Sequence, residues 1–242
     1  MSKHALLIHA HPEPRSFVTA MRDTIAGELE RAGTVVAHSD LYAMGYNPVL
    51  SRSDFPVDQG EDPLVIALAQ RRGYADGTLA PDIMLEIEKV RAADLLVFTF
   101  PIFWFSTPAI LKGWIDRTFV SGPFYGGRRI YSEGGLKGKR AFVALSLGGR
   151  GHMFGDGSLH GPLQQGMLRH FLQGTLGYVG LEVLEPFTAW HVPYVSADDR
   201  KTMLDDLAIA TRRLDGRASL PMPDLGAFDQ TFAPLPQKLP TR

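Results

Sequence analysis

The sequence predicts an α/β fold in which helices cover both faces of a parallel sheet. Short apolar runs alternate with segments whose apolar residues recur at helical spacing along most of the 242 residues. Residues 95–100 are apolar at nearly every position, which is typical of a strand buried on both faces in the middle of such a sheet. Residues 101–105 then read Pro-Ile-Phe-Trp-Phe, which is too bulky and aromatic for an ordinary turn. Because open α/β sheets bind ligands at the carboxyl ends of their strands, we expect this aromatic loop to lie at a binding site.

The first part of the chain predicts two strands and three helices. Two prolines in HPEPR, residues 11–15, end the first strand. Ser16 is a suitable N-cap for the helix that follows, which carries apolar residues at helical spacing. Pro81 marks the start of the third helix. The expected bounds are 5–10 and 34–38 for the strands, 61–72 and 82–93 for the second and third helices, and 40–55 for an irregular connection.

The second part begins with a helix and alternates further strands and helices. Thr107 is expected as its N-cap and Pro108 as its first residue, because proline suits that position. A glycine-rich segment follows, and we interpret it as an active-site lid rather than a packed element. The expected bounds are 109–114 for the helix, 122–138 for the lid, 139–147 and 181–190 for strands, 148–161 for a glycine-rich loop, and 164–179 and 197–214 for helices.

Five strands separated by helices predict right-handed crossover connections. By analogy with other open α/β sheets, we expect the flavodoxin-like strand order 2-1-3-4-5, with the ligand site between strands one and three. One catalytic domain is expected at 1–215. Residues 216–242 are rich in proline, so we expect them to form an extended C-terminal tail.

The composition excludes several classes of function. The net charge of -1 does not indicate a nucleic-acid partner or an acidic membrane surface. The chain has no cysteine, which excludes disulfides, thiol nucleophiles and thiolate metal sites, so any redox chemistry must come from a cofactor. The apolar run near the N-terminus is too short for a signal peptide, and the longest apolar stretch falls short of a membrane span. We therefore expect a cytoplasmic protein without membrane insertion.

The loop after the first strand could bind an anion. The helix N-terminus, Ser16 and Arg15 would together suit a phosphate or pyrophosphate. The alternative is that Ser16 only caps the helix. No GxGxxG sequence is present, which disfavours a Rossmann dinucleotide site. A metal site at His9 and His11 is weaker still, because no ligand partner follows at a recognisable spacing.

Two further loops could complete the site. The aromatic loop could be a hydrophobic plug under the next helix, or a flat wall on which a planar aromatic ligand stacks. The loop at 148–161 contains six glycines, which allow a ligand to approach the backbone closely. It also holds His152 and His160, and a histidine beside a redox ring could donate or accept a proton. The alternative for both histidines is a surface or structural role.

Together these segments resemble the NAD(P)H:quinone oxidoreductases, the DT-diaphorase-like flavoenzymes. The resemblance runs in family order over nearly the whole chain, and the aromatic-loop segment is its most specific part. It implies a flavodoxin-like fold, bound FAD, with FMN left open, NAD(P)H as co-substrate, and an obligate homodimer whose two sites use both subunits. The matching segments are AHPEPRSF (10–17), SDLYAMGYNPVLSRSDF (39–55), PDI…AADLLVF (81–98), FPIFWFSTPAILKGWIDRTF (100–119), LGGRGHMF…LHG (147–161) and VLEP (183–186).

The resemblance also implies roles for individual residues. By this resemblance, the phosphate and adenosine end of the cofactor should contact His11, Ser16, Phe17 and Ala20. The isoalloxazine ring falls at Pro101, Ile102, Phe103, Trp104 and Phe105. The resemblance assigns contacts with the polar edge of the isoalloxazine ring to Leu147, Gly148 and Gly149. It assigns contacts with the outer part of FAD to Val192, Arg200 and Leu204. The substrate pocket falls at Tyr125, Met153, Phe154 and His160, with His160 as the catalytic residue.

Three positions depart from the family pattern. Phe154 stands where the family has a tyrosine that works with the histidine matching His160, so a proton relay would be reduced to His160 and water. Gly127 replaces a second tyrosine in the lid, and Arg15 stands where threonine is frequent. The substrate preference of the family is therefore less transferable than its cofactor.

The expected function is two-electron transfer from NAD(P)H to a quinone or a related aromatic acceptor, in a ping-pong sequence through the flavin. Two alternatives remain. One is a regulatory flavoprotein subunit of a potassium-efflux-type transport system. The other is a flavodoxin-like electron carrier, although such carriers use a strongly acidic docking face that the net charge of -1 does not indicate.

Overall fold

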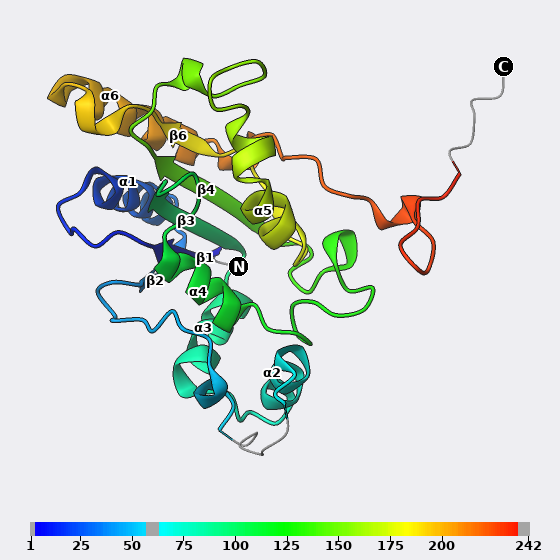
Figure 1. Ribbon diagram of the computed structural model, residues 1–242. Coiled ribbons are helices and arrows are strands. Elements are labelled where there is room, and N and C mark those ends of the chain that lie inside the picture. Colours follow the sequence, from blue (N-terminus) through cyan, green and yellow to red (C-terminus); the bar gives the residue numbers. More distant parts are fainter. Residues whose placement is uncertain (1–2, 57–62, 237–242) are drawn as a thin grey trace.

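The computed structural model describes residues 3–56 and 63–236 and shows a central parallel sheet with helices on both faces (Figure 1). The strand order is β2-β1-β3-β4-β5, with β6 also paired to β4, which confirms the predicted order. All pairings between these strands are parallel. The strands are β1 His4–His9, β2 Val35–Asp40, β3 Leu95–Pro101, β4 Arg140–Ser146, β5 Glu182–Val183 and β6 Phe187–Ala189.

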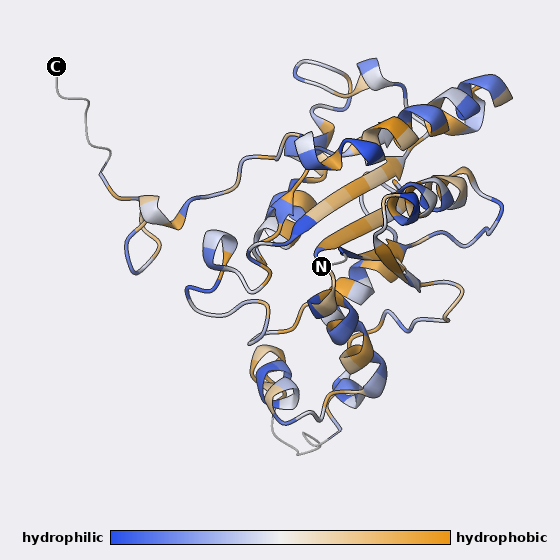
Figure 2. Ribbon diagram, turned by 180° about the vertical axis from the view of Figure 1, so that it is seen from behind, coloured by the Kyte–Doolittle hydropathy of each residue, from blue (hydrophilic) through white to orange (hydrophobic). Residues whose placement is uncertain are grey.

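Alternate residues of the strands point to two separate hydrophobic cores. Leu7 and Val97 pack against helices α1 and α6, whereas Leu6 and Phe98 pack against α3, α4 and α5 on the other face. The hydropathy colouring shows the central strands as the most apolar part of the molecule (Figure 2). The helices are α1 Phe17–Arg31, α2 Ile66–Ala75, α3 Pro81–Ala92, α4 Ala109–Thr118, α5 Arg169–Phe171 and α6 Ala197–Arg212. The second helix thus lies later than the expected 61–72, whose first two residues fall outside the described ranges.

The fifth predicted strand, 181–190, is wrong as a single element. It splits into β5 and β6, which pair with opposite ends of β4. Between them the Glu185 N–H donates to the carbonyl of Ala218, and Leu184 forms a bridge with Ser219. Pro186 cannot donate a ladder hydrogen bond. The beginning of the C-terminal tail therefore pairs with the chain where the strand is interrupted.

The helix predicted at 164–179 is also irregular. Only α5 has α-helical hydrogen bonding, and it is flanked by π-helical turns at Leu163–Met167 and Leu172–Gly177. Glycines in this segment weaken the α-helix. Gly177 also lies so close to Met222 that a Cβ would come within 2.3 Å of the sulfur, so the tail packs directly on the helical backbone.

The start of α4 differs by one residue from the prediction. Pro108 is the N-cap, with an extended ψ of 145°, and Ala109 is the first helical residue. The carbonyl of Pro108 accepts hydrogen bonds from the N–H groups of Leu111 and Lys112, so the proline contributes its acceptor to the first turn. Thr107 is buried but does not cap the helix.

The segment at 122–138 is packed, so its interpretation as an open lid is wrong. Phe124, Ile130 and Leu136 are buried in it. The N–H groups of Tyr131 and Leu136 donate to the carbonyls of Tyr178 and Val179 at 2.8 Å each. These backbone bonds fasten the segment to the helical region that follows β4.

The tail leaves the body of the molecule after it has paired with the β5–β6 connection (Figures 1 and 2). It contains a short 3-10 turn at Leu225–Ala227. Arg128 donates to the carbonyl of Asp229 at 2.6 Å and lies 5.1 Å from the ring of Phe232, so the tail contacts the 122–138 segment. Residues 237–242 lie outside the described ranges. Across the described residues, no helix combines the length and the apolar character needed to cross a bilayer.

Gly113 is required where α4 passes the connection after β2. A Cβ at this position would lie 2.1 Å from the carbonyl oxygen of Pro48. We expect Gly113→Ala to lower the free energy of unfolding by about 1–3 kcal/mol, because the backbone of Pro48 has to move. Gly174→Ala is the matched control, since the nearest atom there is 3.8 Å away. Denaturant titration of both variants measures the difference, and an equal effect would contradict the close approach.

Candidate active site at the carboxyl end of the sheet

Four loops meet at the carboxyl edge of the sheet because they follow neighbouring parallel strands. Backbone hydrogen bonds join them beyond the strand ends. The N–H of Ala10 donates to the carbonyl of Thr99 at 3.0 Å, and the N–H of Ile102 donates to that of Ser146 at 2.8 Å. The N–H of Leu147 donates to the carbonyl of Ala189 at 3.1 Å. The loops after β1, β3, β4 and β6 therefore form one continuous rim.

The aromatic loop is a tight turn that displays its rings. Phe103 and Ser106 exchange both backbone hydrogen bonds, at 3.1 and 3.0 Å. The two residues between them have positive φ angles, 49° for Trp104 and 58° for Phe105, as in a type I′ turn. Bulky side chains rarely adopt this conformation, and such strain is concentrated at functional sites.

The exposure of the rings decides between the two interpretations of this loop. Trp104 is 96% exposed, and Phe103 and Phe105 are close to half exposed. The core beneath is instead filled by Phe100 and Trp114, both fully buried. The three rings of the loop are therefore not a plug under α4. They form an apolar surface at the rim of the sheet.

His160 lies between aromatic rings at the edge of this surface. Its ring centroid is 5.2 Å from that of Phe105 and 5.0 Å from that of Phe154. Phe154 in turn lies 5.4 Å from Trp190. The N–H of His160 donates to the carbonyl of Met153 at 2.9 Å, which fixes the loop that carries the ring. The structure thus brings together four residues from the loops after β3, β4 and β6.

The polar side of the rim is built from backbone. The N–H groups of Trp104, Phe105, Gly148 and Gly149 donate no hydrogen bond to any described residue. His191 holds the glycines, because its Nδ1 is 2.7 Å from the carbonyl oxygen of Gly148 and must carry the proton to donate there. Free N–H groups beside an aromatic surface can bind the acceptor atoms of a planar ligand.

Residues that sequence reasoning missed lie on this rim. The segment after β6 contributes Trp190, His191 and Tyr194, which contact the predicted loop residues. A Cβ on Gly148 would be 3.7 Å from the ring of Tyr194. Their only signal in the sequence is their position after a strand. Arg200, which was predicted to lie near the cofactor, donates to the carbonyl of Val195 at 2.7 Å and so braces this segment.

The turn after β1 presents a helix N-terminus. The Ser16 hydroxyl oxygen accepts from the N–H of Thr19 at 3.1 Å, which confirms the predicted cap. The N–H groups of Phe17 and Val18 have no intrahelical partner at such a position. The Nδ1 of His11 accepts from the N–H of Glu13 at 3.0 Å, and burial lowers the pKa of His11. Its Nε2–H is therefore a neutral donor. The side chain of Arg15 is 91% exposed and forms an ion pair with Glu13.

The remaining predicted residues divide between the core and a separate groove. Phe17, Val192 and Leu204 pack on the core under α1 and α6. Tyr125 lies in a groove of about 290 Å³ between α2, α4 and the segment after α5. Its ring is 5.8 Å from that of Tyr178, and its hydroxyl is 3.4 Å from the side-chain oxygen of Gln70. The structure does not place Tyr125 in the cluster around His160.

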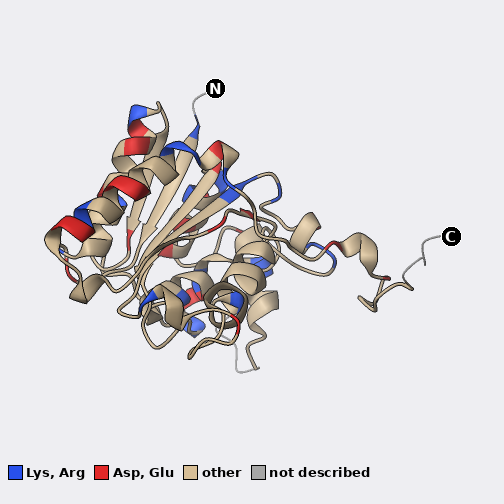
Figure 3. Ribbon diagram, turned by 90° about the horizontal axis from the view of Figure 1, so that it is seen from above, with Lys and Arg blue, Asp and Glu red and all other residues tan. Residues whose placement is uncertain are grey.

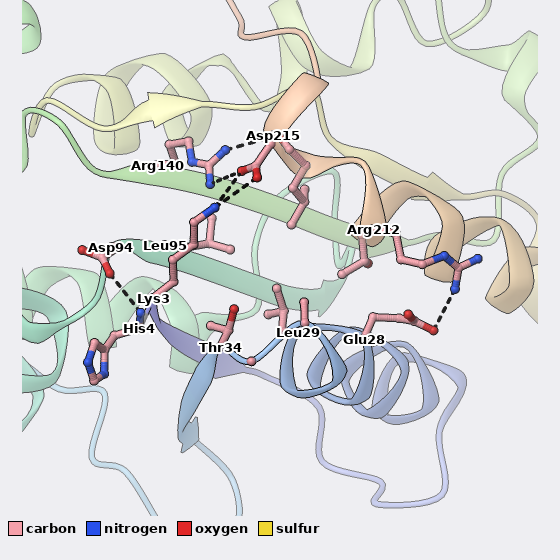
Figure 4. A pocket seen from close by; sticks show the side chains of 14 residues that line it. Lys3, His4, Glu28, Leu29, Thr34, Asp94, Leu95, Arg140, Arg212 and Asp215 are labelled. Atoms are coloured by element: carbon pink, nitrogen blue, oxygen red, sulfur yellow. Dashed lines mark hydrogen bonds and ion pairs between the residues drawn. The ribbon is translucent and has the colours of Figure 1, made fainter. Parts of the chain in front are cut away.

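A cavity of about 350 Å³ lies at the opposite, amino end of the strands (Figure 4). Its charged side chains satisfy one another: Asp215 pairs with Lys3 at 3.0 Å and with Arg140 at 2.9 Å, and Glu28 pairs with Arg212 at 2.9 Å. Ligands of open α/β sheets bind at the carboxyl end. The rim with exposed rings and free N–H groups is therefore the better candidate.

Comparison with known proteins agrees with this geometry. The model of the flavodoxin-like fold family matches residues 3–211. Among curated relatives, rat NAD(P)H dehydrogenase [quinone] 1 is 35% identical, with 84% of this chain and 74% of the relative covered. Human ribosyldihydronicotinamide dehydrogenase [quinone] is 36% identical over 84% of this chain and 87% of its own.

The chain belongs to the NAD(P)H dehydrogenase (quinone) family of flavodoxin-like proteins. A solved structure of a Klebsiella pneumoniae protein described as a quinone reductase superposes with a TM-score of 0.89. It is 32% identical, and the match covers all of this chain and 97% of that one. The suspected resemblance and the fold class are thus confirmed.

Membership of this family implies a flavin cofactor, and the residues present fit one. The exposed ring of Trp104 suits the apolar face of a planar tricyclic ring. The free N–H groups of Gly148 and Gly149 suit its acceptor edge. The N-terminus of α1 suits a phosphate. Among the described residues, no group of three or more His, Cys, Asp or Glu side chains is placed to hold a metal ion.

A buried histidine beneath this site makes the fold sensitive to acid. His9 is 1% exposed, and burial lowers its pKa from 6.5 to about 4. Asp40 and Asp23 act to raise that pKa, whereas Arg22 and His11 act to lower it. Between pH 6.5 and 4 the unfolded chain binds a proton here that the folded chain does not, so stability falls as the pH falls through this window.

We expect the free energy of unfolding of the wild type to decrease by up to about 3 kcal/mol more than that of His9→Gln between pH 7 and pH 4. Glutamine does not titrate, so the difference between the two proteins isolates this residue from the carboxylates and from His11. Urea titrations at several pH values measure it. Parallel pH profiles for the two proteins would contradict the assignment.

Proposed function

We propose that this protein is a flavin-dependent NAD(P)H:quinone oxidoreductase. The single observation that supports it most strongly is the strained, exposed turn of Trp104 and Phe105, which adjoins His160 at one edge and free backbone N–H groups at the other. The family relatives are NAD(P)H and ribosyldihydronicotinamide dehydrogenases of the quinone type. The proposal includes FAD as the cofactor, a homodimer as the assembly and the cytoplasm as the location.

The side chains divide the work between binding and proton transfer. Phe103, Trp104 and Phe105 would hold the flat face of the flavin and exclude water from it. The N–H groups of Gly148 and Gly149 would orient its polar edge. A bound flavin would supply the hydride-transfer chemistry between NAD(P)H and the acceptor. His160 can hold or supply a proton at the edge of this surface, since an imidazole has both a donor and an acceptor nitrogen.

The phosphate end would lie at the turn after β1. The N-terminus of α1, the hydroxyl of Ser16 and the Nε2–H of His11 all offer donors to an anion there. We propose FAD rather than FMN because the resemblance assigns Val192, Arg200 and Leu204, on the 3-10 turn after β6 and on α6, to the outer part of FAD. Acid release of the cofactor followed by mass measurement tests this choice, and recovery of FMN alone would overturn it.

The position of Tyr125 supports the homodimer. Within one chain Tyr125 lies with Tyr178 and Gln70, away from His160. Tyr125, which the resemblance assigns to the substrate pocket, would reach a substrate on the rim if that groove faced the rim of a second subunit. Sedimentation equilibrium of the purified protein should give twice the chain mass of 26.6 kDa. A monomer with full activity would overturn this part of the proposal.

Catalysis is tested by following NAD(P)H oxidation with quinones, nitroaromatics and azo dyes as acceptors. Rapid two-electron reduction without a partner protein supports the enzyme. A stable one-electron state of the bound flavin would support the flavodoxin-like carrier instead. Activity only with an added transport protein would support the regulatory subunit. Lys and Arg positions occur together with Asp and Glu positions along the outer helices (Figure 3). Together with the net charge of -1, this favours the enzyme over a carrier that needs a strongly acidic docking face.

Trp104→Ala should weaken flavin binding by about tenfold to a hundredfold, because the ligand loses its largest stacking surface. The fold should be unaffected within about 0.5 kcal/mol, since the ring is 96% exposed. Flavin content per chain and titration of the flavin-free protein measure the effect. Leu68→Ala, on α2 and 52% exposed, is the control. Equal flavin content in both variants would remove the loop from the cofactor site.

A further inference from the structure

A chain of buried polar side chains runs beneath the turn that precedes α1. His9 and Thr99 are neighbours in the register of β1 and β3, and both are almost fully buried. The Nδ1 of His9 is 2.8 Å from the hydroxyl oxygen of Thr99, and its Nε2 is 3.2 Å from that of Thr19. The hydroxyl of Thr19 is 3.0 Å from that of Ser16, the N-cap. The chain thus connects the interior of the sheet to the end of the helix.

One arrangement of hydrogens satisfies every contact. The Thr19 hydroxyl donates to the carbonyl of Glu13 at 3.2 Å, so it must accept at its other contacts. The Nε2 of His9 then carries the proton and donates to Thr19, while its Nδ1 accepts from Thr99. The ring is neutral in this arrangement, which agrees with the lowering of its pKa to about 4 by burial.

The consequence concerns the proton of Ser16. The oxygen of Ser16 accepts from the N–H of Thr19, and its own hydrogen has two choices: Thr19 or a ligand at the helix N-terminus. Because His9 already donates to Thr19, Ser16 can turn its hydrogen outward without leaving a buried oxygen unpaired. The turn itself is held by the Thr19 bond to Glu13, whose carbonyl also accepts from the N–H of Ser16 at 3.1 Å.

We propose that His9 is a positioning residue for phosphate binding: by donating to Thr19, it releases the Ser16 hydroxyl to donate to the phosphate of the cofactor. This inference rests on the proposed function, which places the flavin phosphate at the N-terminus of α1. His9 itself touches no ligand, since it is buried beneath the turn. Its effect must therefore pass through Thr19 and Ser16, which makes the effect separable from a general loss of stability.

The test is a double-mutant cycle read by flavin binding. Flavin-free wild type, His9→Leu, Ser16→Ala and the double variant are titrated with FAD and with riboflavin, which has no phosphate. Each single variant should bind FAD about tenfold more weakly, the loss expected for one hydrogen bond to a charged group. The double variant should be no weaker than Ser16→Ala, because the two residues act in series. Binding of riboflavin should be unchanged throughout.

Conservative variants separate positioning from packing. His9→Gln keeps a donor near the position of Nε2 and should restore FAD binding toward the wild-type level. Thr19→Val removes the acceptor that competes for the Ser16 hydrogen without changing β1, so FAD binding should stay near the wild-type level. Additive losses in the cycle, or an equal loss for riboflavin, would overturn the inference while leaving the proposed function intact. Failure of the wild type to bind any flavin would instead overturn the proposed function.

Discussion

Replacing Arg117 by methionine should lower the free energy of unfolding by about 3–5 kcal/mol. The side chain is 3% exposed and donates to both oxygens of Asp54, at 2.9 and 3.1 Å. It also donates to Asp82 at 2.6 Å and to the carbonyl of Asn47 at 2.9 Å. Asp54 is itself 2% exposed. Loss of the guanidinium would leave a buried carboxylate without its partner, and this unpaired charge accounts for most of the cost.

The matched control is Lys112→Met, less than two turns earlier in α4. Lys112 pairs with Asp116 at 2.7 Å, but both side chains are well exposed, so we expect a loss of at most about 1 kcal/mol. Adding Asp54→Asn to the Arg117 variant should recover part of its stability, because the unpaired charge is removed. Chemical denaturation measures all variants. Equal losses for Lys112→Met and Arg117→Met, or no recovery in the double variant, would contradict the unpaired-charge account.

This buried pair shows what a sequence pattern cannot reveal. The alternation of apolar runs predicted the sheet, because burial on two faces imposes a local pattern. Its strand order was expected by analogy with other open α/β sheets. Asp54 lies in the segment that was predicted to be an irregular connection. Nothing in the sequence distinguishes Arg117 from the other charged residues on helices. Their contact joins residues 63 positions apart. Only the fold shows that the connection after β2 is fastened to the helix that follows the aromatic loop.

The errors in the prediction have the same origin. The strand expected at 181–190 divides where Pro186 cannot donate and where the tail pairs with Glu185 and Leu184. The glycines at 122–138 suggested mobility. In the structure a Cβ on Gly135 would lie 2.0 Å from the carbonyl oxygen of Pro123, so that glycine permits close packing. Glycine content alone does not distinguish a flexible segment from a tightly packed one.

The candidate site was easier to predict than these contacts, because its loops follow strands whose position was already known. The aromatic loop and His160 could be named from the chain alone. Their geometry could not. Only the folded structure shows the positive φ angles of Trp104 and Phe105. The same holds for the contact between Phe154 and Trp190. Trp190 contributes to the wall behind His160, and no motif distinguished it.

His160→Ala should slow turnover by about a hundredfold to ten-thousandfold, the range for loss of a general acid or base. Flavin content should stay near that of the wild type, because the apolar surface of Phe103 to Phe105 remains. The ring of His160 is held on two sides by Phe105 and Phe154, so its position is defined before any ligand arrives. Phe154 has no hydroxyl that could take over the proton.

Rapid-mixing measurements should follow NAD(P)H oxidation and quinone reduction separately over a range of pH. The wild type and the alanine variant should differ in the pH dependence of at least one of the two steps, because the variant has no imidazole to exchange a proton. His152→Ala is the matched control, since His152 lies exposed on the same loop and should leave both rates unchanged. If His160→Ala changes the rate of neither step, His160 only packs against its neighbours. A rate loss with an unaltered pH profile would show that the imidazole positions the substrate without exchanging a proton.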